Sequence, residues 1–362
     1  MLVLDHAVAA SPLVEIADGR IRSVRFDKSN GDAGAQRIVG ALLPGLVDLQ
    51  VNGAGGRAVD EAGTEALDHV AKTVAEHGAA AFLPTLITAP FESLVEQVAA
   101  VAEWIDSKPE GGAVPLGIHV EGPFLSNAGA HPPEAMIDPA QDKIESLLAA
   151  GRGTIRLVTL SPSRPGAAAA VAQFCAAGVS VSLGHGSGED GIAECVAAGA
   201  TMATHLFNAM GLSDHRNPGM PGRIMDDAAL SCSFIVDGIH VHEMRLRHAV
   251  KTIGVERTVL ISDSVSAMGM PDGEYALGSQ TVTLRDGAVR NSDGTLAGSA
   301  LTMEAAVENF ARAVPTAGPW TLARIASTNP ARMIGADDWG KIAVGAHAKF
   351  AHLRPDGTIR AV

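Results

Sequence analysis

Residues 155–208 decide the fold, and they read IRLVTLSPSRPGAAAAVAQFCAAGVSVSLGHGSGEDGIAECVAAGATMATHLFN. Three apolar runs lie in this stretch, at 155–162, 179–185 and 202–208, and the helical pattern GIAECVAAG (191–199) separates the second run from the third. The runs are mostly continuous rather than alternating, which is typical of strands covered on both faces by helices. The stretch therefore predicts parallel strands joined by helices.

Five further runs of the same type flank this stretch: LVDLQVN (46–52), AAFLPTLIT (80–88), PLGIHVEG (115–122), LSCSFIVDG (230–238) and TVLISDS (258–264). The mean spacing of the eight runs is about 30 residues, the size of one strand with its helix. A (β/α)8 TIM-like barrel, an α/β fold, is the economical prediction. A doubly wound parallel sheet is the alternative, and it is disfavoured because no G-x-G-x-x-G motif opens the turns after these strands.

The two ends of the chain carry a different pattern. Residues 13–26, LVEIADGRIRSVRF, predict two short strands around an Asp-Gly pair, which tight hairpins favour. At the other end, KFAHL and TIRAV alternate in the same way around a Pro-Asp-Gly turn. We therefore expect a small β-sandwich domain built from both termini. The predicted extents are 1–43 with 335–362 for the β domain, and 44–334 for the barrel.

A β-like segment follows the last predicted barrel strand. It reads YALGSQTVTLRDGAVRNSDGTLAG (275–298), and two Asp-Gly pairs divide it into short runs. We expect a β insertion around 272–297, in the loop between the eighth strand and its helix. Because such loops line the catalytic face of a barrel, the insertion is placed to contact the substrate.

The composition is that of a globular protein with a strong negative charge. Of the 362 residues, 47% are hydrophobic and 19% are charged, and the net charge is −13. This charge repels polyphosphate, so nucleic acid is not an expected partner. No apolar run reaches the ~18 residues of a membrane helix, and no signal peptide is evident. The three cysteines lack C-x-x-C spacing, so we expect a cytoplasmic protein with no membrane partner.

Five polar residues lie at the carboxyl ends of separate predicted strands, where barrels gather their active sites: Glu121, His185, His205, His240 and Asp263. One carboxylate and two imidazoles can form a three-ligand site for a divalent metal, with an open position for water. Asp263 is then a candidate for proton transfer. A single histidine is more often structural than a ligand, so it is the joint placement of these residues that favours a metal site.

Seven segments, spread over nearly the whole chain, form a set: PGLVDLQVNGAGG (44–56), HVEGPFL (119–125), GHGSG (184–188), THLFNAM (204–210), DGIHVH (237–242), ISDS (261–264) and LAGSALTM (296–303). This set resembles the N-acetylglucosamine-6-phosphate deacetylases of the amidohydrolase superfamily. HVEGP and THLFNAM are the segments most specific to this family, whereas GHGSG taken alone would be weak evidence for it. The resemblance extends to the split β domain and to the NPAR segment (329–332) of a late helix.

The resemblance implies a role for each residue at a matching position. Glu121, His185 and His205 would ligate one divalent metal ion per subunit, with Zn²⁺ favoured and Fe²⁺ or Co²⁺ also suited to these ligands. Asp263 would be the catalytic acid and base. Eight residues would contact the phosphosugar: His131, Asn208, Ala209, Arg216, His240, Leu296, Ala297 and Gly298. The resemblance also implies a homodimer, in which Arg216 would reach the phosphate in the partner's site.

Two features depart from wider expectation for the superfamily. Many of its barrels begin with H-x-H on the first strand, whereas this chain has Gln50 and Asn52 there. Neutral amides are poor metal ligands, so a single metal ion is predicted. Gly186 stands where relatives often have Ser or Thr, which leaves open how His185 is hydrogen-bonded.

The function implied by the resemblance is hydrolysis of N-acetylglucosamine 6-phosphate to glucosamine 6-phosphate and acetate. Deacetylation of N-acetylgalactosamine 6-phosphate is a near alternative, because the two sugars differ at one hydroxyl group. Cyclic-amide hydrolysis is more distant, and it is weakened because the fourth strand, IRLVTLSP, offers no bridging lysine. A catalytically silent barrel that binds a phosphosugar is an alternative from another class, and the presence of every expected ligand disfavours it.

Overall fold

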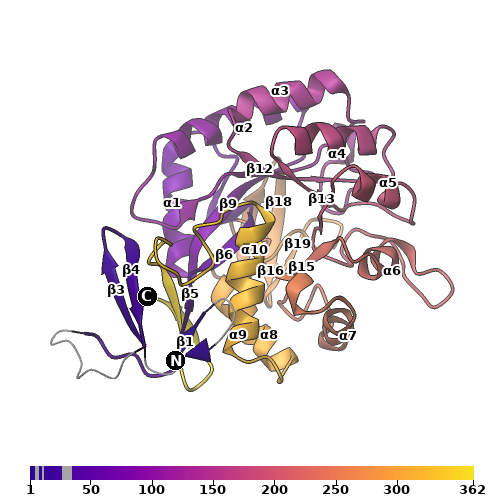
Figure 1. Cartoon of the computed structure of the whole chain (residues 1–362). Coiled ribbons are helices and arrows are strands. Elements are labelled where there is room, and N and C mark those ends of the chain that lie inside the picture. The colour runs from indigo at the N-terminus through magenta and orange to yellow at the C-terminus, as the bar shows by residue number, and fades with distance from the viewer. Residues whose placement is uncertain (5–7, 10–11, 27–34) are drawn as a thin grey trace.

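The computed structural model describes residues 1–4, 8–9, 12–26 and 35–362, and the described part contains a barrel of eight parallel strands (Figure 1). Around the barrel the strands are β6 (Leu46–Val51), β9 (Ala79–Ile87), β11 (Ile118–Glu121), β12 (Ile155–Leu160), β13 (Ser180–Leu183), β14 (Met202–Ala203), β15 (Ser231–Ile235) and β16 (Thr258–Ile261). Val51 pairs with Ser264 and closes the ring. The (β/α)8 prediction is confirmed: seven of the eight apolar runs contain one of these strands, and the run at 80–88 covers all of β9 except Ala79.

Eight main helices alternate with the strands: α1 (Thr64–Glu76), α2 (Phe91–Asp106), α3 (Gln141–Gly151), α4 (Ala167–Ala176), α5 (Ile192–Ala197), α6 (Gly219–Asp226), α7 (Glu243–Ile253) and α8 (Met303–Ala313). Their apolar stripes recur at helical spacing and face the strands, as in α1, where Leu67, Val70 and Val74 are buried. Thr302 caps α8 by accepting a hydrogen bond from the backbone N–H of Ala305. A continuous aliphatic core therefore lies between the strands and the helices.

The inward face of the barrel is more polar than its outward face. Side chains alternate along each strand, so Asp48 and Gln50 of β6 share one face. Both are buried, and Asp48 Oδ1 accepts the backbone N–H of Ser262, which places it inside the ring. The polar interior lies directly below the strand ends that carry the candidate site.

A small β domain stands at one side of the barrel, where both chain ends meet (Figure 1). One sheet has the order β2 (Val8–Ala9), β1 (Leu2–Val3), β5 (Ala41–Pro44), β20 (Phe350–Leu353) and β21 (Ile359–Ala361), and the other is the hairpin of β3 (Leu13–Ala17) and β4 (Arg20–Arg25). Leu2, Ile21 and Phe350 lie in a core of their own. The β-sandwich prediction is confirmed, whereas the exact domain limits stay a prediction.

The expected insertion forms a three-stranded antiparallel sheet, which we call the insertion sheet: β17 (Gly273–Leu277), β18 (Gln280–Arg285) and β19 (Ala288–Arg290). Its apolar side chains form a small core with Ile87 of β9 and with Val265, which follows β16. The sheet is therefore packed on the carboxyl end of the barrel.

Short elements complete the described chain: β7 (Gly53–Ala54), β8 (Arg57–Ala58), β10 (Val114–Pro115), two 3₁₀ helices (Pro133–Ala135 and Val255–Arg257), α9 (Pro319–Ala323), a π-helical turn (Arg324–Thr328) and α10 (Asn329–Met333). Within the described ranges, no helix combines the length and the apolar character needed to cross a membrane.

Candidate active site

A cavity of about 370 Å³ opens at the carboxyl ends of the barrel strands. Its lining contains Asn52 and ten of the twelve site residues expected from the sequence: Glu121, His131, His185, His205, Asn208, Ala209, His240, Asp263, Leu296 and Gly298. A larger cavity, of about 600 Å³, lies beside α1 and α2 and contains none of the strand-end residues. The smaller cavity is therefore the candidate active site.

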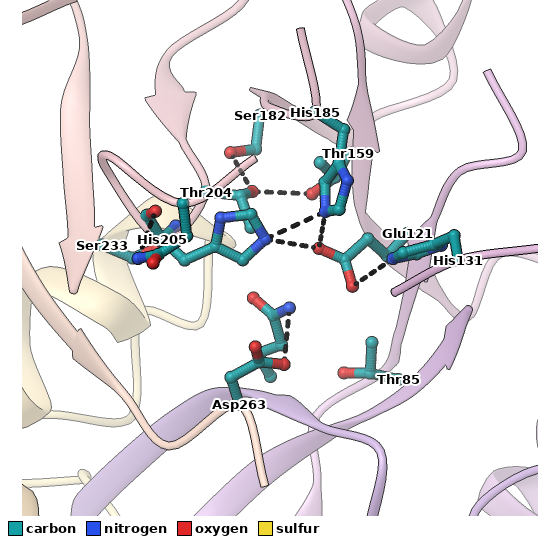
Figure 2. A network of polar contacts seen from close by, with 12 residues as sticks. Thr85, Glu121, His131, Thr159, Ser182, His185, Thr204, His205, Ser233 and Asp263 are labelled. Carbon is teal, nitrogen blue, oxygen red and sulfur yellow. Dashed lines mark hydrogen bonds and ion pairs between the residues drawn. The ribbon is translucent and has the colours of Figure 1, made fainter. Parts of the chain in front are cut away.

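Glu121, His185 and His205 converge on one point in this cavity (Figure 2). Oε1 of Glu121 lies 3.1 Å from Nε2 of His205 and 3.3 Å from Nε2 of His185, and the two Nε2 atoms are 3.1 Å apart. Ligand atoms about 2.0–2.1 Å from a tetrahedral metal ion are separated from each other by about 3.3 Å. The three donor atoms thus have nearly the spacing that such an ion requires.

The Nε2 atoms of both histidines face this point, and hydrogen bonding fixes the lone pair of His185 there. His185 Nδ1 lies 2.9 Å from the backbone carbonyl of Asn127, which can only accept, so the neutral ring has its lone pair on Nε2. Nε2 of His205 faces Glu121 Oε1 at 3.1 Å, and its buried Nδ1 has no hydrogen-bond partner among the residues that the structure describes. A carboxylate and two imidazole nitrogens facing one another suit a divalent cation.

The charge state of Glu121 fits this role. Its side chain is almost fully buried, and burial alone would raise its pKa. The imidazoles of His131, His185 and His205 outweigh burial and hold the pKa of Glu121 well below its usual range. Glu121 is therefore a carboxylate at neutral pH, although water is excluded from it.

His131 forms a second grouping with two of these residues. Its Nε2 lies 3.5 Å from Oε2 of Glu121, and its ring packs edge-on against His185 with the centroids 4.5 Å apart. Glu121, His131 and His185 offer donor atoms that all lie within 4.8 Å of one another, so they too could hold a metal ion. His131 faces the other carboxylate oxygen, however, and Thr88 holds its Nδ1 through the backbone N–H at 3.3 Å and the hydroxyl group at 2.9 Å.

The backbone is strained at four of the site residues, one of them Ala209 with a φ of 51°. The φ angles of His185, His205 and Asp263 are 49°, 35° and 50°, in the left-handed region that residues other than glycine seldom adopt. Such conformations cost about 1–3 kcal/mol each and cluster at functional sites. For His205 the backbone is held in place by its N–H group, which donates to Ser233 Oγ at 2.8 Å.

Asp263 lies in the same cavity and is held on one side only. Its Oδ1 accepts hydrogen bonds from Gln50 Nε2 and from Asn52 Nδ2, both at 2.9 Å. Burial, followed by repulsion from Glu121, raises the pKa of Asp263 to about 7. The sequence placed the two amides in the barrel mouth but did not identify them as partners of Asp263, because the residues are more than 200 positions apart.

The remaining predicted contact residues are distributed unevenly. Asn208, His240, Leu296 and Gly298 line the cavity, together with Ala209. His240 is fixed by Asp237, whose Oδ2 lies 2.6 Å from its Nδ1. A side chain at position 298 would lie 2.4 Å from Val265 Cγ1, so the close approach of this loop requires glycine.

Two predicted residues lie outside the cavity lining. Ala297 is fully buried in the core beneath the insertion sheet, so only its backbone is available near the site. Arg216 is exposed on the loop that precedes α6, where its backbone N–H donates to Asp214 Oδ1 at 2.7 Å. Within one chain, the structure therefore does not bring Arg216 to the other site residues.

A chain of hydroxyl groups lies next to the candidate ligands (Figure 2). His119 Nδ1 lies 3.1 Å from the carbonyl of Leu49, so the neutral ring accepts at Nε2, 2.8 Å from Thr159 Oγ1. Thr159 must then accept from Thr204 at 2.7 Å, and Thr204 from Ser182 at 2.6 Å. This chain connects β11, β12, β13 and the residue after β14, directly behind the three candidate ligands.

The structure also answers the question raised by Gly186. A Cβ atom at this position would lie 2.8 Å from Ser161 Oγ and 3.1 Å from Met220 Sδ. The hydroxyl group of Ser161 therefore occupies the space that a side chain at 186 would need. His185 is oriented instead by the Asn127 carbonyl, a contact that no local sequence pattern indicates.

Comparisons with known proteins agree with this geometry. The chain is 33% identical over 327 residues to the N-acetylglucosamine-6-phosphate deacetylase of Lysinibacillus sphaericus, covering 88% of this chain and 84% of the relative. It is 34% identical over 305 residues to the N-acetylgalactosamine-6-phosphate deacetylase of Escherichia coli O157:H7, covering 83% of this chain and 80% of the relative.

A solved structure extends the likeness to the whole fold. It is an aspartate-to-alanine variant of the N-acetyl-D-glucosamine-6-phosphate deacetylase of Mycobacterium smegmatis, in complex with N-acetyl-D-glucosamine-6-phosphate. It superposes with a TM-score of 0.90 at 34% identity, covering 99% of this chain and 94% of that one. The sequence profile described as "Amidohydrolase family" matches residues 41–362. The chain belongs to the amidohydrolase family.

Proposed function

We propose that this protein removes the acetyl group from N-acetylglucosamine 6-phosphate by metal-dependent hydrolysis, giving glucosamine 6-phosphate and acetate. The convergence of Glu121, His185 and His205 in a cavity that also holds Asp263 carries the proposal. The names of the relatives in the same family supply the substrate class. The three converging candidate ligands and the buried acid favour an enzyme over a catalytically silent barrel that only binds a phosphosugar.

Glu121 Oε1, His185 Nε2 and His205 Nε2 would hold one divalent ion. These atoms are preferred over His131 because they already lie 3.1–3.3 Å from each other, whereas His131 faces Oε2 at 3.5 Å. One carboxylate and two imidazoles suit Zn²⁺, and Fe²⁺ or Co²⁺ are the alternatives. When bound, such an ion lowers the pKa of a water molecule and polarises an amide carbonyl.

Asp263 would move the proton. Because Gln50 and Asn52 both donate to Oδ1, Oδ2 is the oxygen left to take a proton from the attacking water and return it to the leaving amine. A pKa raised by burial toward neutrality suits a group that must both accept and donate at neutral pH. Gln50 and Asn52 keep the carboxylate oriented while it does so.

The other cavity residues would bind the sugar. His131 would contact the acetamide group, and Asn208 with the backbone of Ala209 would contact the sugar and its phosphate. His240, fixed by Asp237, would bind the phosphate. The loop of Leu296, Ala297 and Gly298 would contact the sugar through its backbone.

Arg216 would act in a homodimer. It is exposed in one chain and lies outside the cavity, so it would serve the site of the partner subunit. A planar guanidinium group suits a phosphate, which needs a fixed cation in a chain of net charge −13. We further propose a cytoplasmic location, because the three cysteines are all free thiols.

A second candidate substrate is N-acetylgalactosamine 6-phosphate, since the chain is 34% identical to a deacetylase named for that sugar. The two sugars differ at one hydroxyl group, and the reaction would use the same residues. Steady-state kinetics on both sugars would separate the two candidates, because the preferred substrate has the higher kcat/KM.

The deciding experiment is acetate release from N-acetylglucosamine 6-phosphate and from unphosphorylated N-acetylglucosamine, before and after treatment with a chelator. We expect release that prefers the phosphorylated sugar, stops on chelation and returns when metal is added. Absence of release from either sugar by metal-loaded protein would refute the proposed function and direct attention to other amides.

A further inference from the structure

We propose that Arg290 of the insertion sheet binds the phosphate group of the substrate within its own chain. The observation that carries this proposal is the position of Arg290 in the lining of the active-site cavity, which also includes His240, and its pairing with Leu296 in the loop from Gly294 to Gly298. The proposal rests on the proposed function, because it takes the substrate to be a sugar phosphate. Under this proposal, each chain has a phosphate-binding cation of its own in addition to Arg216.

The insertion sheet spans the cavity from one end to the other. At the turn between β17 and β18, Gln280 Nε2 donates to the carbonyl of Ala130 at 2.7 Å, next to His131. At the turn between β18 and β19, a Cβ atom on Gly287 would lie 4.0 Å from Ile239 Cδ1, next to His240. Arg290 pairs with Thr283, midway along β18, and with Leu296, so it lies between these two ends and next to the loop that lines the cavity.

The local backbone fixes Arg290 but does not use up its donors. Its Nη1 donates to the carbonyl of Gly294 at 2.8 Å. The turn between them is locked by Asn291, whose side chain accepts the N–H of Thr295 at 3.0 Å. Asp293 is occupied in the same turn, because it accepts that N–H group at 2.9 Å. A guanidinium group has five N–H donors, so most of them are left for a ligand.

The charges around the cavity favour an anion at this place. Among the described residues that line it, Arg290 alone is a lysine or arginine, and it forms no ion pair with a described carboxylate. The two acidic residues that line the cavity are Glu121, a candidate metal ligand, and Asp263, the candidate acid and base. A phosphate monoester carries a charge of about −1.5 to −2 at pH 7 and is bound best by a planar guanidinium group.

The test compares Arg290→Gln with Arg285→Gln, which removes the same charge from an exposed position of the same sheet outside the cavity lining. For the metal-loaded protein, we expect Arg290→Gln to raise KM for N-acetylglucosamine 6-phosphate by about 10–100-fold with kcat nearly unchanged. Arg290→Lys should recover part of the loss. Arg285→Gln should keep KM within about twofold.

Binding of inorganic phosphate, measured by calorimetry, separates this proposal from the function on which it rests. We expect Arg290→Gln to bind phosphate at least about tenfold more weakly than the wild type and than Arg285→Gln. Equal binding by the three proteins, or a fall in kcat with KM unchanged, would overturn the role of Arg290. If the wild type released no acetate, the proposed function would fail, and the phosphate measurement would still decide the role of Arg290.

Discussion

The Nε2 atoms of His185 and His205 lie 3.1 Å apart, in a site from which water is largely excluded. In its neutral form His185 donates its Nδ1–H group to the Asn127 carbonyl, so its Nε2 presents a lone pair to Glu121 Oε1 at 3.3 Å. A lone pair and a carboxylate oxygen at this distance repel each other unless a cation lies between them. A proton or a metal ion held between these atoms would remove the repulsion, so the spacing favours Glu121, His185 and His205 as ligands of one cation.

Replacing Glu121 with Gln should remove the metal ion. Oε1 of Glu121 is the atom shared by both histidines, and an amide oxygen is a much weaker ligand than a carboxylate. We expect metal affinity to fall by at least about 100-fold, with activity lost in parallel. Metal per chain after gel filtration measures the effect. Glu134→Gln, at an exposed nearby position, is the control, and a variant at 121 that kept its metal would contradict the assignment.

Replacing Asp263 with Asn should stop turnover and spare binding. The new side chain can still accept from Gln50 and Asn52 through its oxygen, but it cannot take a proton. We expect kcat to fall by at least about 100-fold, the usual contribution of a general acid and base, with metal content unchanged. Residual activity above about a hundredth of wild type would show that another group moves the proton.

Asp263 should also determine how kcat/KM decreases at acidic pH. Asp263 must be deprotonated to act as a base, so kcat/KM should decrease as the pH falls through its pKa. Burial raises that pKa to about 7 in the chain without metal, and a bound cation would lower it. This decrease should therefore lie at or below about pH 7, and it should be absent from whatever activity Asp263→Asn retains.

The fold could be predicted because strands buried on both faces leave continuous apolar runs in the sequence. These runs do not show at which residue the hydrogen bonding between neighbouring strands ends. The run at 202–208 predicts a full strand, yet β14 contains only Met202 and Ala203, because the chain turns to a positive φ at His205. That turn directs the imidazole to Glu121, so the local departure from regular structure serves the site.

The candidate site could be predicted only in part, for a similar reason. Glu121, His185 and Asp263 could be found because strand ends meet at one edge of a barrel. The contacts that orient them could not, since Gln50 lies 213 residues from Asp263 and the Asn127 carbonyl that fixes His185 has no side-chain signature. Such contacts are created by the tertiary fold and leave no local pattern.

A buried carboxyl group at the base of the site predicts a pH-dependent stability. Burial raises the pKa of Asp48 to about 6, although its Oδ1 accepts the backbone N–H groups of Gln50 and Ser262. The folded chain therefore holds a proton that the unfolded chain has lost, and this contribution to stability disappears as the pH rises from about 4 through about 6. Asp48→Asn keeps the acceptor oxygen and does not titrate.

We expect the free energy of unfolding of Asp48→Asn, minus that of the wild type, to increase by about 2 kcal/mol between pH 4 and pH 7.5. Urea unfolding at several pH values measures this difference. Asp190→Asn, which changes an exposed carboxyl group, should show a difference that is independent of pH. If the difference for Asp48→Asn were also independent of pH, burial would not raise the pKa of Asp48, and the prediction would be wrong.

Substitutions at Gly186 and Ser161 should have non-additive effects on the free energy of unfolding. A side chain at 186 would lie 2.8 Å from Ser161 Oγ, which would have to rotate away from Ser163 Oγ, its hydrogen-bond partner at 3.1 Å. We expect Gly186→Ser alone to cost about 1–2 kcal/mol and the cost to be largely absent in the Ser161→Ala background. A double-mutant cycle by urea unfolding measures the coupling, and additive effects would show that the two positions are independent.

Arg216 should act on the site of the partner subunit. The residue is exposed and does not line the cavity of its own chain, so a role in phosphate binding requires a second copy. Two variants, Arg216→Ala with weakened phosphate binding and Asp263→Asn without turnover, test this when they are expressed together and assayed at a substrate concentration well below KM. In a mixed dimer, the chain with intact Asp263 receives an intact Arg216 from its partner, so one site is complete. Random pairing should restore roughly a quarter of wild-type activity. If Arg216 served its own chain, no mixed dimer would contain a complete site and activity would stay at the level of the separate variants.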